Sequence, residues 1–169
     1  GVSIGATISH TFTGLSPGTA YEFQAISYRG TLNEDAVFSP LSNIVAATTS
    51  SGTDTTPPNL TSPSASASGS SSASGSVTTD EGNGTLYWVA TTSATAPSAA
   101  QVQAGQDHNG AAAAASGSQA VSATGSKGVS VSGLSADTTY YLHFQQADSA
   151  GNDSTVVSSG SFTTSTSSG

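Results

Sequence analysis

The stretch Leu134–Phe144 reads Leu-Ser-Ala-Asp-Thr-Thr-Tyr-Tyr-Leu-His-Phe, a turn that leads into an apolar strand. A second copy, Leu15–Phe23, reads Leu-Ser-Pro-Gly-Thr-Ala-Tyr-Glu-Phe. The leucine, threonine and tyrosine that the copies share lie 119 positions apart (134 − 15, 138 − 19 and 140 − 21). A motif repeated at a fixed spacing is typical of one supersecondary unit used twice. The sequence therefore predicts an all-β chain of two related domains.

Charged side chains are scarce, 7% of the 169 residues, against roughly a quarter in typical domains. The chain has ten acidic residues and only two basic ones, Arg29 and Lys127, which gives a formal net charge of −8. Two basic residues cannot neutralise the phosphates of a nucleic acid or hold the chain on an anionic membrane. No apolar run approaches the roughly 20 residues that span a bilayer, and no signal peptide stands at Gly1. We therefore expect no nucleic-acid partner and no membrane insertion.

The chain contains no cysteine. Disulfides, thiolate catalysis and cysteine-bound zinc are therefore excluded. An extracellular domain without disulfides depends on its hydrophobic core alone, which is common in bacterial and viral surface proteins.

Residues 1–49 carry the pattern of three strands. Apolar and polar residues alternate over 7–13 and over 20–25, with a Pro-Gly turn signal between them. A polar hairpin loop then precedes a closing strand over 38–49. Because a β-sandwich needs about seven strands, either earlier strands lie outside this sequence or another chain supplies them.

Two segments of small and hydroxylated residues read as connections. Residues 50–58 contain serine, threonine, glycine and a Pro-Pro pair, and predict a linker. Residues 165–169 are similar to those that follow Thr48, so a second linker or tail, leading to a further domain, is expected there.

Residues 59–164 contain enough strand signals for a complete domain. Leu60 begins an edge strand. The Ser/Ala/Gly alternation over 64–74 is typical of disorder by composition, or of a strand whose inward residues, such as Ala65 and Ala67, are small. We favour the strand, because apolar residues follow it directly.

The middle of this domain combines a turn, a central strand and a helix. Asn83-Gly84 is a strong hairpin signal. Thr85–Thr91 is apolar on both faces, which indicates a strand in the middle of a sheet. Residues 97–105 give the helical signal, with Ser98 as its N-cap and a glycine as its end.

The end of the domain repeats the pattern of residues 1–49. Glycines around Ala111–Ala115 favour a short strand there. Val129 and Val131 alternate with polar residues and lead into the repeated motif. A turn over 148–153 then precedes a final strand that runs from 156 to 162.

These motifs carry a resemblance to a known family. The stretch 15–23, followed by Ser-Pro-Leu-Ser and a strand that ends Ala-Thr-Thr, resembles the second half of a fibronectin type III domain, and the similarity covers 5–49. It implies a tyrosine corner, in which a tyrosine hydroxyl bonds back to the backbone and joins two sheets. The residues that the resemblance places at this structural corner are Leu15, Tyr21, Leu134 and Tyr140.

The second domain is similar to the divergent fibronectin/Ig-like repeats of bacterial surface proteins and of phage tails or fibres. The similarity rests on Asp-Thr-Thr-Pro-Pro at 54–58 and Asp-Ser-Ala-Gly-Asn at 148–152. This domain departs from animal repeats because Trp88, its one tryptophan, falls on a third strand and because it inserts a helix. The resemblance implies tandem Ig/fibronectin-like β-sandwiches, of which the first is incomplete.

The histidines do not form a catalytic pattern. His10 is interpreted as a rim residue, and His108 merely adjoins Asp107 in sequence, whereas a triad needs groups from separate elements. His143 falls between Leu142 and Phe144 and is therefore expected on the face opposite the core, exposed or at the rim. We expect no enzyme.

Calcium is the candidate cofactor. Asp148, Asn152 and Asp153 share one turn, and Asp54 stands at the entrance of the domain; all four offer hard oxygen ligands. In surface-protein repeats that look similar, acidic linker residues hold calcium between domains. The alternative is that Asp148 caps its own turn. The pair at 80–81 reads as an ordinary acidic turn.

Three Asn-x-Ser/Thr acceptor sites for glycans also occur, at Asn59, Asn83 and Asn152. In a chain so rich in serine and threonine, such sites arise easily by chance.

Three functions fit these observations. The first is a structural or adhesive module of a phage fibre, tail or head decoration, or of a bacterial surface appendage, with weak multivalent contacts to polysaccharide. The second is an accessory module of a secreted polysaccharide-degrading enzyme. The third is a filament subunit that neighbouring copies complete by strand donation. All three place the chain outside the cell or on a virion, among other copies of itself or neighbouring structural proteins.

Overall fold

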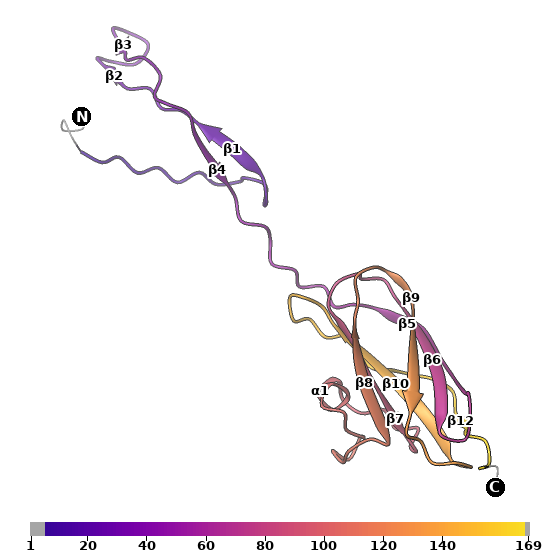
Figure 1. Ribbon diagram of the computed structural model, residues 1–169. Coiled ribbons are helices and arrows are strands. Elements are labelled where there is room, and N and C mark those ends of the chain that lie inside the picture. Colours follow the sequence, from indigo (N-terminus) through magenta and orange to yellow (C-terminus); the bar gives the residue numbers. More distant parts are fainter. Residues whose placement is uncertain (1–5, 168–169) are drawn as a thin grey trace. The chain divides into compact units, whose positions relative to one another are not determined.

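The computed structural model describes residues 6–167 and divides the chain into two compact units. Unit 1 is Gly1–Thr53 and unit 2 is Asp54–Gly169, so the boundary falls inside the expected linker. Within the described range the chain forms antiparallel β-strands and one short helix, which confirms the all-β prediction (Figure 1). No helix in that range is long and apolar enough to cross a membrane.

Unit 1 consists of two strand pairs. β1 (Ala20–Phe23) pairs with β4 (Val45–Thr48), and β2 (Tyr28–Arg29) pairs with β3 (Val37–Phe38), both antiparallel. The predicted turn before β1 is present, and Gly18 there has a φ of 60°, a left-handed conformation that glycine adopts without strain. The predicted hairpin loop joins β2 to β3.

The strand expected over 7–13 does not form. These residues are extended but unpaired, and the side chains of Ile8 and Phe12 are 73% and 55% exposed. A strand is held by hydrogen bonds to a neighbouring strand, and no strand lies beside 7–13 in the described part of unit 1. Apolar and polar residues do alternate over 7–13, but the segment has no neighbouring strand among the described residues to pair with.

Unit 2 contains two sheets. β5, β6 and β9 form the first, and β8, β7, β10 and β11 form the second, in which β12 also pairs with β10. Every pairing is antiparallel. The bounds of the strands are Leu60–Ala67 (β5), Ser72–Thr79 (β6), Thr85–Thr91 (β7), Ala115–Ala120 (β8), Gly125–Ser132 (β9), Thr139–Ala147 (β10), Val157–Ser158 (β11) and Phe162–Thr163 (β12).

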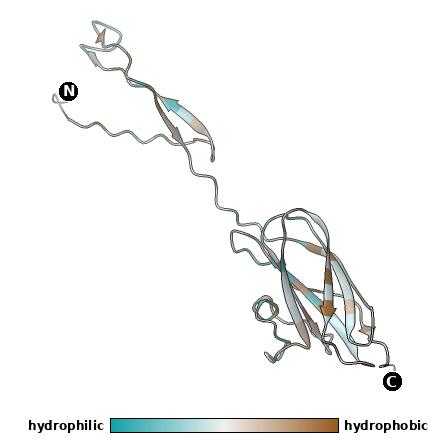
Figure 2. Ribbon diagram, in the orientation of Figure 1, coloured by the Kyte–Doolittle hydropathy of each residue, from teal (hydrophilic) through white to brown (hydrophobic). Residues whose placement is uncertain are grey.

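One hydrophobic core joins the two sheets. Hydrophobic and hydrophilic residues alternate along the strands (Figure 2), so one face of each sheet contributes to the core. Leu142 and Phe144 of β10 are fully buried and pack in one cluster with Val77 of β6 and Val131 of β9. The central strand β7 adds Leu86, Trp88 and Ala90 to the same cluster. The predictions of a central strand at 85–91 and of an inward-facing strand at 129–131 are confirmed.

The segment 64–74 is a hairpin and not one strand. β5 ends at Ala67, a turn follows, and β6 begins at Ser72. The Ser68 N–H donates to the Ser72 carbonyl at 2.9 Å, which closes the turn. Ala65 and Ala67 do pack against the core, as expected for small inward residues. The turn was missed because serine and glycine fill both the strands and the loop.

Small residues on this sheet leave room for the large ones on the other. A Cβ on Gly75 of β6 would lie 2.4 Å from the Leu142 side chain, closer than atoms can approach. On the outer face, serine hydroxyls pair across β5 and β6, with Ser64 and Ser76 2.9 Å apart.

The hairpin predicted at Asn83-Gly84 is wrong. β6 belongs to the first sheet and β7 to the second, so this loop crosses between sheets. The loop is fastened to the end of β10 instead: the Asn83 side chain accepts the Ser149 N–H at 2.9 Å. A Cβ on Gly84 would lie 2.1 Å from the Ala147 carbonyl oxygen, so glycine is required there by close approach as well as by a φ of 117°.

The helix α1 (Ala99–Gln103) begins and ends as predicted. The hydroxyl of Ser98 accepts from the Gln101 N–H, and the Gln101 side chain accepts from the Ser98 N–H, which is a capping box. α1 contacts β7 and β10 and buries Val102.

Two expectations for the flanking segments are wrong. Of residues 111–115, only Ala115, the first residue of β8, lies in a strand, and Ala112 makes one isolated bridge. The rest form a loop, which Asp107 closes by accepting the Ala111 N–H. The final strand is split into β11 and β12, and Ser159, whose N–H donates to the Leu142 carbonyl, lies between them.

Candidate functional site

The repeated motif makes the same hydrogen bond in both units. The Tyr140 hydroxyl accepts the N–H of Ser135 at 3.0 Å, and the Tyr21 hydroxyl accepts the N–H of Ser16 at 2.9 Å. In each copy the bond spans five residues and ties the start of a strand to the turn before it. This is the bond that a tyrosine corner makes. Leu134 is buried in the core of unit 2, whereas its counterpart Leu15 is half-buried.

A threonine directly after the last strand of each unit bonds to that unit's copy of the motif. The Thr164 hydroxyl donates to the Ser135 carbonyl at 2.7 Å and accepts the Thr138 N–H at 3.1 Å. The Thr49 hydroxyl makes the same two bonds, to the Ser16 carbonyl at 2.6 Å and from the Thr19 N–H at 2.9 Å. The offset from Thr49 to Thr164 is 115 (164 − 49).

A serine repeats in the same way. The Ser154 hydroxyl accepts the Gln146 N–H while the Ser154 N–H donates to the Gln146 carbonyl. Ser39 and Ser27 make the matching pair of bonds, at offsets of 115 (154 − 39) and 119 (146 − 27). Sequence reasoning used the Ser-Pro-Leu-Ser motif that contains Ser39 but missed its role. The two offsets together, 119 for the strand and 115 for the segment after it, would have paired Ser39 with Ser154 from the sequence alone.

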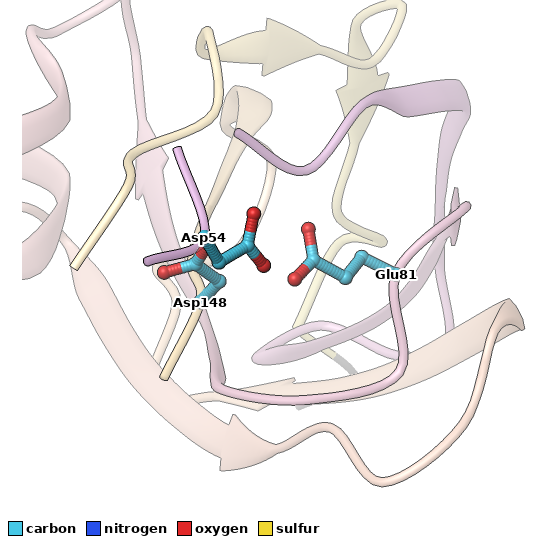
Figure 3. Close-up of side chains that lie close together, drawn as sticks. All are labelled: Asp54, Glu81 and Asp148. Atoms are coloured by element: carbon cyan, nitrogen blue, oxygen red, sulfur yellow. The ribbon is translucent and has the colours of Figure 1, made fainter. Parts of the chain in front are cut away.

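A cluster of three carboxylates lies in unit 2. One oxygen each of Asp54, Glu81 and Asp148 lies within 4.8 Å of the others. The carboxylates of Asp54 and Glu81 point toward one another, and Asp148 lies beside Asp54 (Figure 3). Asp54 is exposed, Glu81 half-buried and Asp148 buried.

The pKa values of Glu81 and Asp148 are shifted in opposite directions. Burial raises the pKa of Glu81, and the negative charges of Asp148, Asp54 and Asp80 raise it further. Burial also acts to raise the pKa of Asp148, but hydrogen bonds from the Asn152 side chain and from the N–H groups of Asn152, Ala150 and Gly151 outweigh it and lower that pKa. Glu81 therefore takes up a proton more readily than Asp148 does.

The four predicted calcium ligands are only partly brought together. Asn152 donates its side-chain amide to the Asp148 carboxylate at 2.7 Å and to the Asp54 carbonyl at 3.2 Å. Asp153 faces elsewhere and accepts from Gln103 at 2.7 Å and Gln145 at 3.0 Å. Asp148 also accepts the N–H groups at 150 and 152, so the alternative in which it caps its own turn describes its contacts.

Glu81 belongs to the cluster although the sequence marked it as an ordinary acidic turn. It joins because the loop that contains it crosses between sheets, which the hairpin prediction excluded. Gln146, which is fully buried, donates to the Glu81 carbonyl at 3.2 Å, while its Oε1 has no partner among the described residues. Three carboxylates offer the hard oxygens that calcium prefers, but calcium takes six to eight ligands, so water or backbone oxygens would have to complete a site here.

His143 is buried, which corrects the expectation that it is exposed or at the rim. It faces away from the core, as the alternation predicts, but it is 0% exposed. The outer face of β7 and β10 is covered by the segment that contains α1. One ring nitrogen lies 2.9 Å from the Thr91 hydroxyl and the other 2.7 Å from the Ser158 hydroxyl.

Burial lowers the pKa of His143, against a hydrogen bond with the Ser93 carbonyl that raises it; the charge of His108 lowers it further. His10, which was interpreted as a rim residue, is exposed, and its ring packs edge-on against Phe12 with centroids 4.8 Å apart. The Asp107 side chain accepts the N–H groups of Asn109 and Ala111 and is occupied by its own loop. No convergence of a nucleophile, a base and an acid is present around these three histidines in residues 6–167.

An open pocket of about 230 Å³ lies beside α1. Tyr87 and Gln103 line it together with the serines and the glycine of β8 at 116–118. Gly117 has no side chain because a Cβ there would lie 2.5 Å from the Trp88 ring. Of the three possible glycan acceptors, Asn59 and Asn83 are exposed and Asn152 is half-buried.

No protein-family model matches the chain, and no curated protein sequence matches it.

Proposed function

We propose that this chain is a non-enzymatic structural or adhesive module made of tandem Ig/fibronectin-like β-sandwiches, carried on a virion appendage or a bacterial surface appendage. The observation that carries the proposal is the repeated set of contacts of Tyr21 and Tyr140, Thr49 and Thr164, and Ser39 and Ser154. Side chains that bond to the backbone of the same chain stabilise the fold. Because the same contacts occur in both units, the two units are two copies of one structural scaffold in this proposal.

The strand order supports the sandwich. Two sheets, β5-β6-β9 and β8-β7-β10-β11 with β12 also paired to β10, share one core. Eight antiparallel strands in two sheets, with connections that cross between them, fit the Ig-like architecture, which has seven to nine strands.

The surface chemistry supports adhesion of a weak, summed kind. Few charges and many hydroxyls, with an open pocket lined by Tyr87 and Gln103, suit contact with neutral polysaccharide, where an aromatic ring packs on a sugar and polar groups bond its hydroxyls. Such contacts gain strength when many copies are displayed together.

The test is binding of the 169-residue chain to purified surface polysaccharides, once as a soluble monomer and once displayed densely on beads. We expect monomer dissociation constants weaker than about 1 mM, equivalent to roughly 4 kcal/mol, and retention of the beads. Glycosidase, esterase and protease assays with the same sample are expected to show no turnover. Hydrolysis that tracks the purified chain would overturn the structural role, and failure of the beads to bind would remove adhesion.

A further inference from the structure

Unit 1 exposes the apolar residues that a folded domain buries. None of its described residues, 6–53, is buried. Monomeric soluble proteins rarely expose such a set together unless it is an interaction site. The exposed large hydrophobic residues, each at least half exposed, are Ile8, Phe12, Ile26, Tyr28, Leu32, Val37, Phe38, Leu41, Ile44 and Val45.

Unit 2 shows what covers the equivalent residues. β1 and β4 pair in the register of β10 and β12, since Tyr21 opposite Ala47 matches Tyr140 opposite Phe162 at offsets of 119 (140 − 21) and 115 (162 − 47). In unit 2 the other edge of β10 pairs with β7 from Tyr141 to Ala147. The equivalent edge in unit 1, residues 22–28, has no such partner in the described part of the chain.

A second edge is unpaired as well. Residues 6–13 correspond to β9 at the offset of 119 (125 − 6 and 132 − 13), and β9 pairs along its length with β6. Phe12 and Phe23 correspond to Val131 and Leu142, which lie together in the core of unit 2. The rings of Phe12 and Phe23 contact each other, with centroids 4.8 Å apart. They line an open groove of about 460 Å³ together with Ile8, His10 and Val45.

We propose that this groove is the docking site for a β-segment with the strand pattern of β5–β8, joined through a short connection to the N-terminal side of residue 6. In unit 2 only Val121–Thr124 separates β8 from β9, so a segment joined at the same point reaches both edges intramolecularly. One of its strands pairs with 6–13, as β6 does with β9. Another pairs with 22–28, as β7 does with β10, and small inward residues leave room for Phe12 and Phe23.

This inference rests on the proposed kinship of the two units. The inference can fail while the proposed function stands, because the fold and binding of unit 2 are measured on the 169-residue chain without the added copy, where Trp88 is the one tryptophan.

The test adds a copy of residues 59–124, the segment at hand with this pattern, directly before residue 6 of the 169-residue chain. We expect the fusion to bind less of the dye ANS than the unmodified chain, which reports loss of exposed apolar surface, and amide exchange at 22–26 to slow at least about tenfold. The matched control replaces Leu86 and Trp88 by aspartate in the added copy only, and is expected to keep the dye binding and fast exchange of the unmodified chain.

A second variant sharpens the register. Ala25 corresponds to Phe144 at the offset of 119 (144 − 25), so Ala25→Phe in the fusion is expected to slow exchange further. A fusion whose exchange at 22–26 and dye binding equal those of the unmodified chain overturns the proposal. So does an unmodified chain that sediments as a dimer with 22–26 already protected, because a second copy is then the occupant.

Discussion

Units 1 and 2 make the same corner contacts in opposite surroundings. The Tyr140 bond lies under a core in which Leu142 and Phe144 are fully buried, and the Tyr21 bond lies in a unit with no buried residue among 6–53. The geometry of the corner therefore forms locally and does not need a core. The stability of the corner does, because a hydrogen bond contributes more where water cannot replace it. Each of the first three predictions below changes one position in unit 2 and its counterpart in unit 1.

The largest difference is expected for the apolar residues. Leu142→Ala removes a fully buried side chain and should lower the free energy of unfolding of unit 2 by roughly 2–5 kcal/mol. Phe23→Ala, where the ring is half-buried, should leave it unchanged. Urea denaturation followed by Trp88 fluorescence measures unit 2 alone. Equal losses in the two variants would mean that the units unfold together.

The threonine that follows the last strand comes next. Thr164→Val keeps the shape but leaves the Thr138 N–H and the Ser135 carbonyl without their partner, at a cost of about 1–3 kcal/mol because Thr164 is buried. Thr49→Val is the control and should not shift the Trp88 transition. If Thr164→Val unfolds at the same urea concentration as the wild type, water makes the hydrogen bonds that the Thr164 hydroxyl made, and the corner is open to solvent.

The tyrosine hydroxyl should matter less, since it accepts one bond. Tyr140→Phe is expected to cost on the order of 1 kcal/mol, measured as a shift of the thermal midpoint, without any change in polysaccharide binding. Tyr21→Phe should give no shift. An unchanged midpoint for Tyr140→Phe would mean that the bond to Ser135 contributes nothing to the fold.

The smallest effect, and one without a counterpart in unit 1, concerns Glu81. Its pKa is raised from its ordinary value of 4.5, so the folded state holds the proton more tightly and loses stability as the pH rises through the raised value. Glu81→Gln should therefore melt above wild type at neutral pH and together with it below pH 4.5. If added calcium raises the wild-type midpoint and not that of Glu81→Gln, the cluster binds the cation.

Asp148 gives the opposite sign. Its pKa is lowered from 3.8, so its contribution is present above that pH and is lost as the pH falls through the lowered value. Asp148→Asn should melt below wild type at neutral pH, and the gap should close in acid. A gap that persists in acid would mean that the side chain acts through packing and not through its charge.

What the sequence predicted depends on whether a residue acts locally. The corner, the helix cap at Ser98 and the turn at Asp148 depend on residues within about five positions of each other, and all of them form. Partners distant in sequence were harder to predict. Asn83-Gly84 carries a hairpin signal, but only the contact with Ser149, 66 positions away, decides that the loop crosses between sheets.

The same limit explains the site residues. His143 was correctly placed on the outer face, but the covering segment lies some 50 positions before it in the chain. Glu81 meets Asp148 for a similar reason. Alternation says which face a residue takes, and says nothing of what lies on that face.

The hydroxyl pairs on the outer face of β5 and β6 have a consequence for the conditions in which the chain keeps its shape. Ser64 with Ser76, and Thr139 with Thr163 on the other sheet, link strands through neutral groups. Mobile ions screen attractions between charges over about 10 Å at 0.1 M salt, but they leave a hydroxyl pair almost untouched. A fold whose strands are linked by hydroxyl–hydroxyl hydrogen bonds, and in which 7% of the residues are charged, should keep nearly the same thermal midpoint from low to high salt concentration.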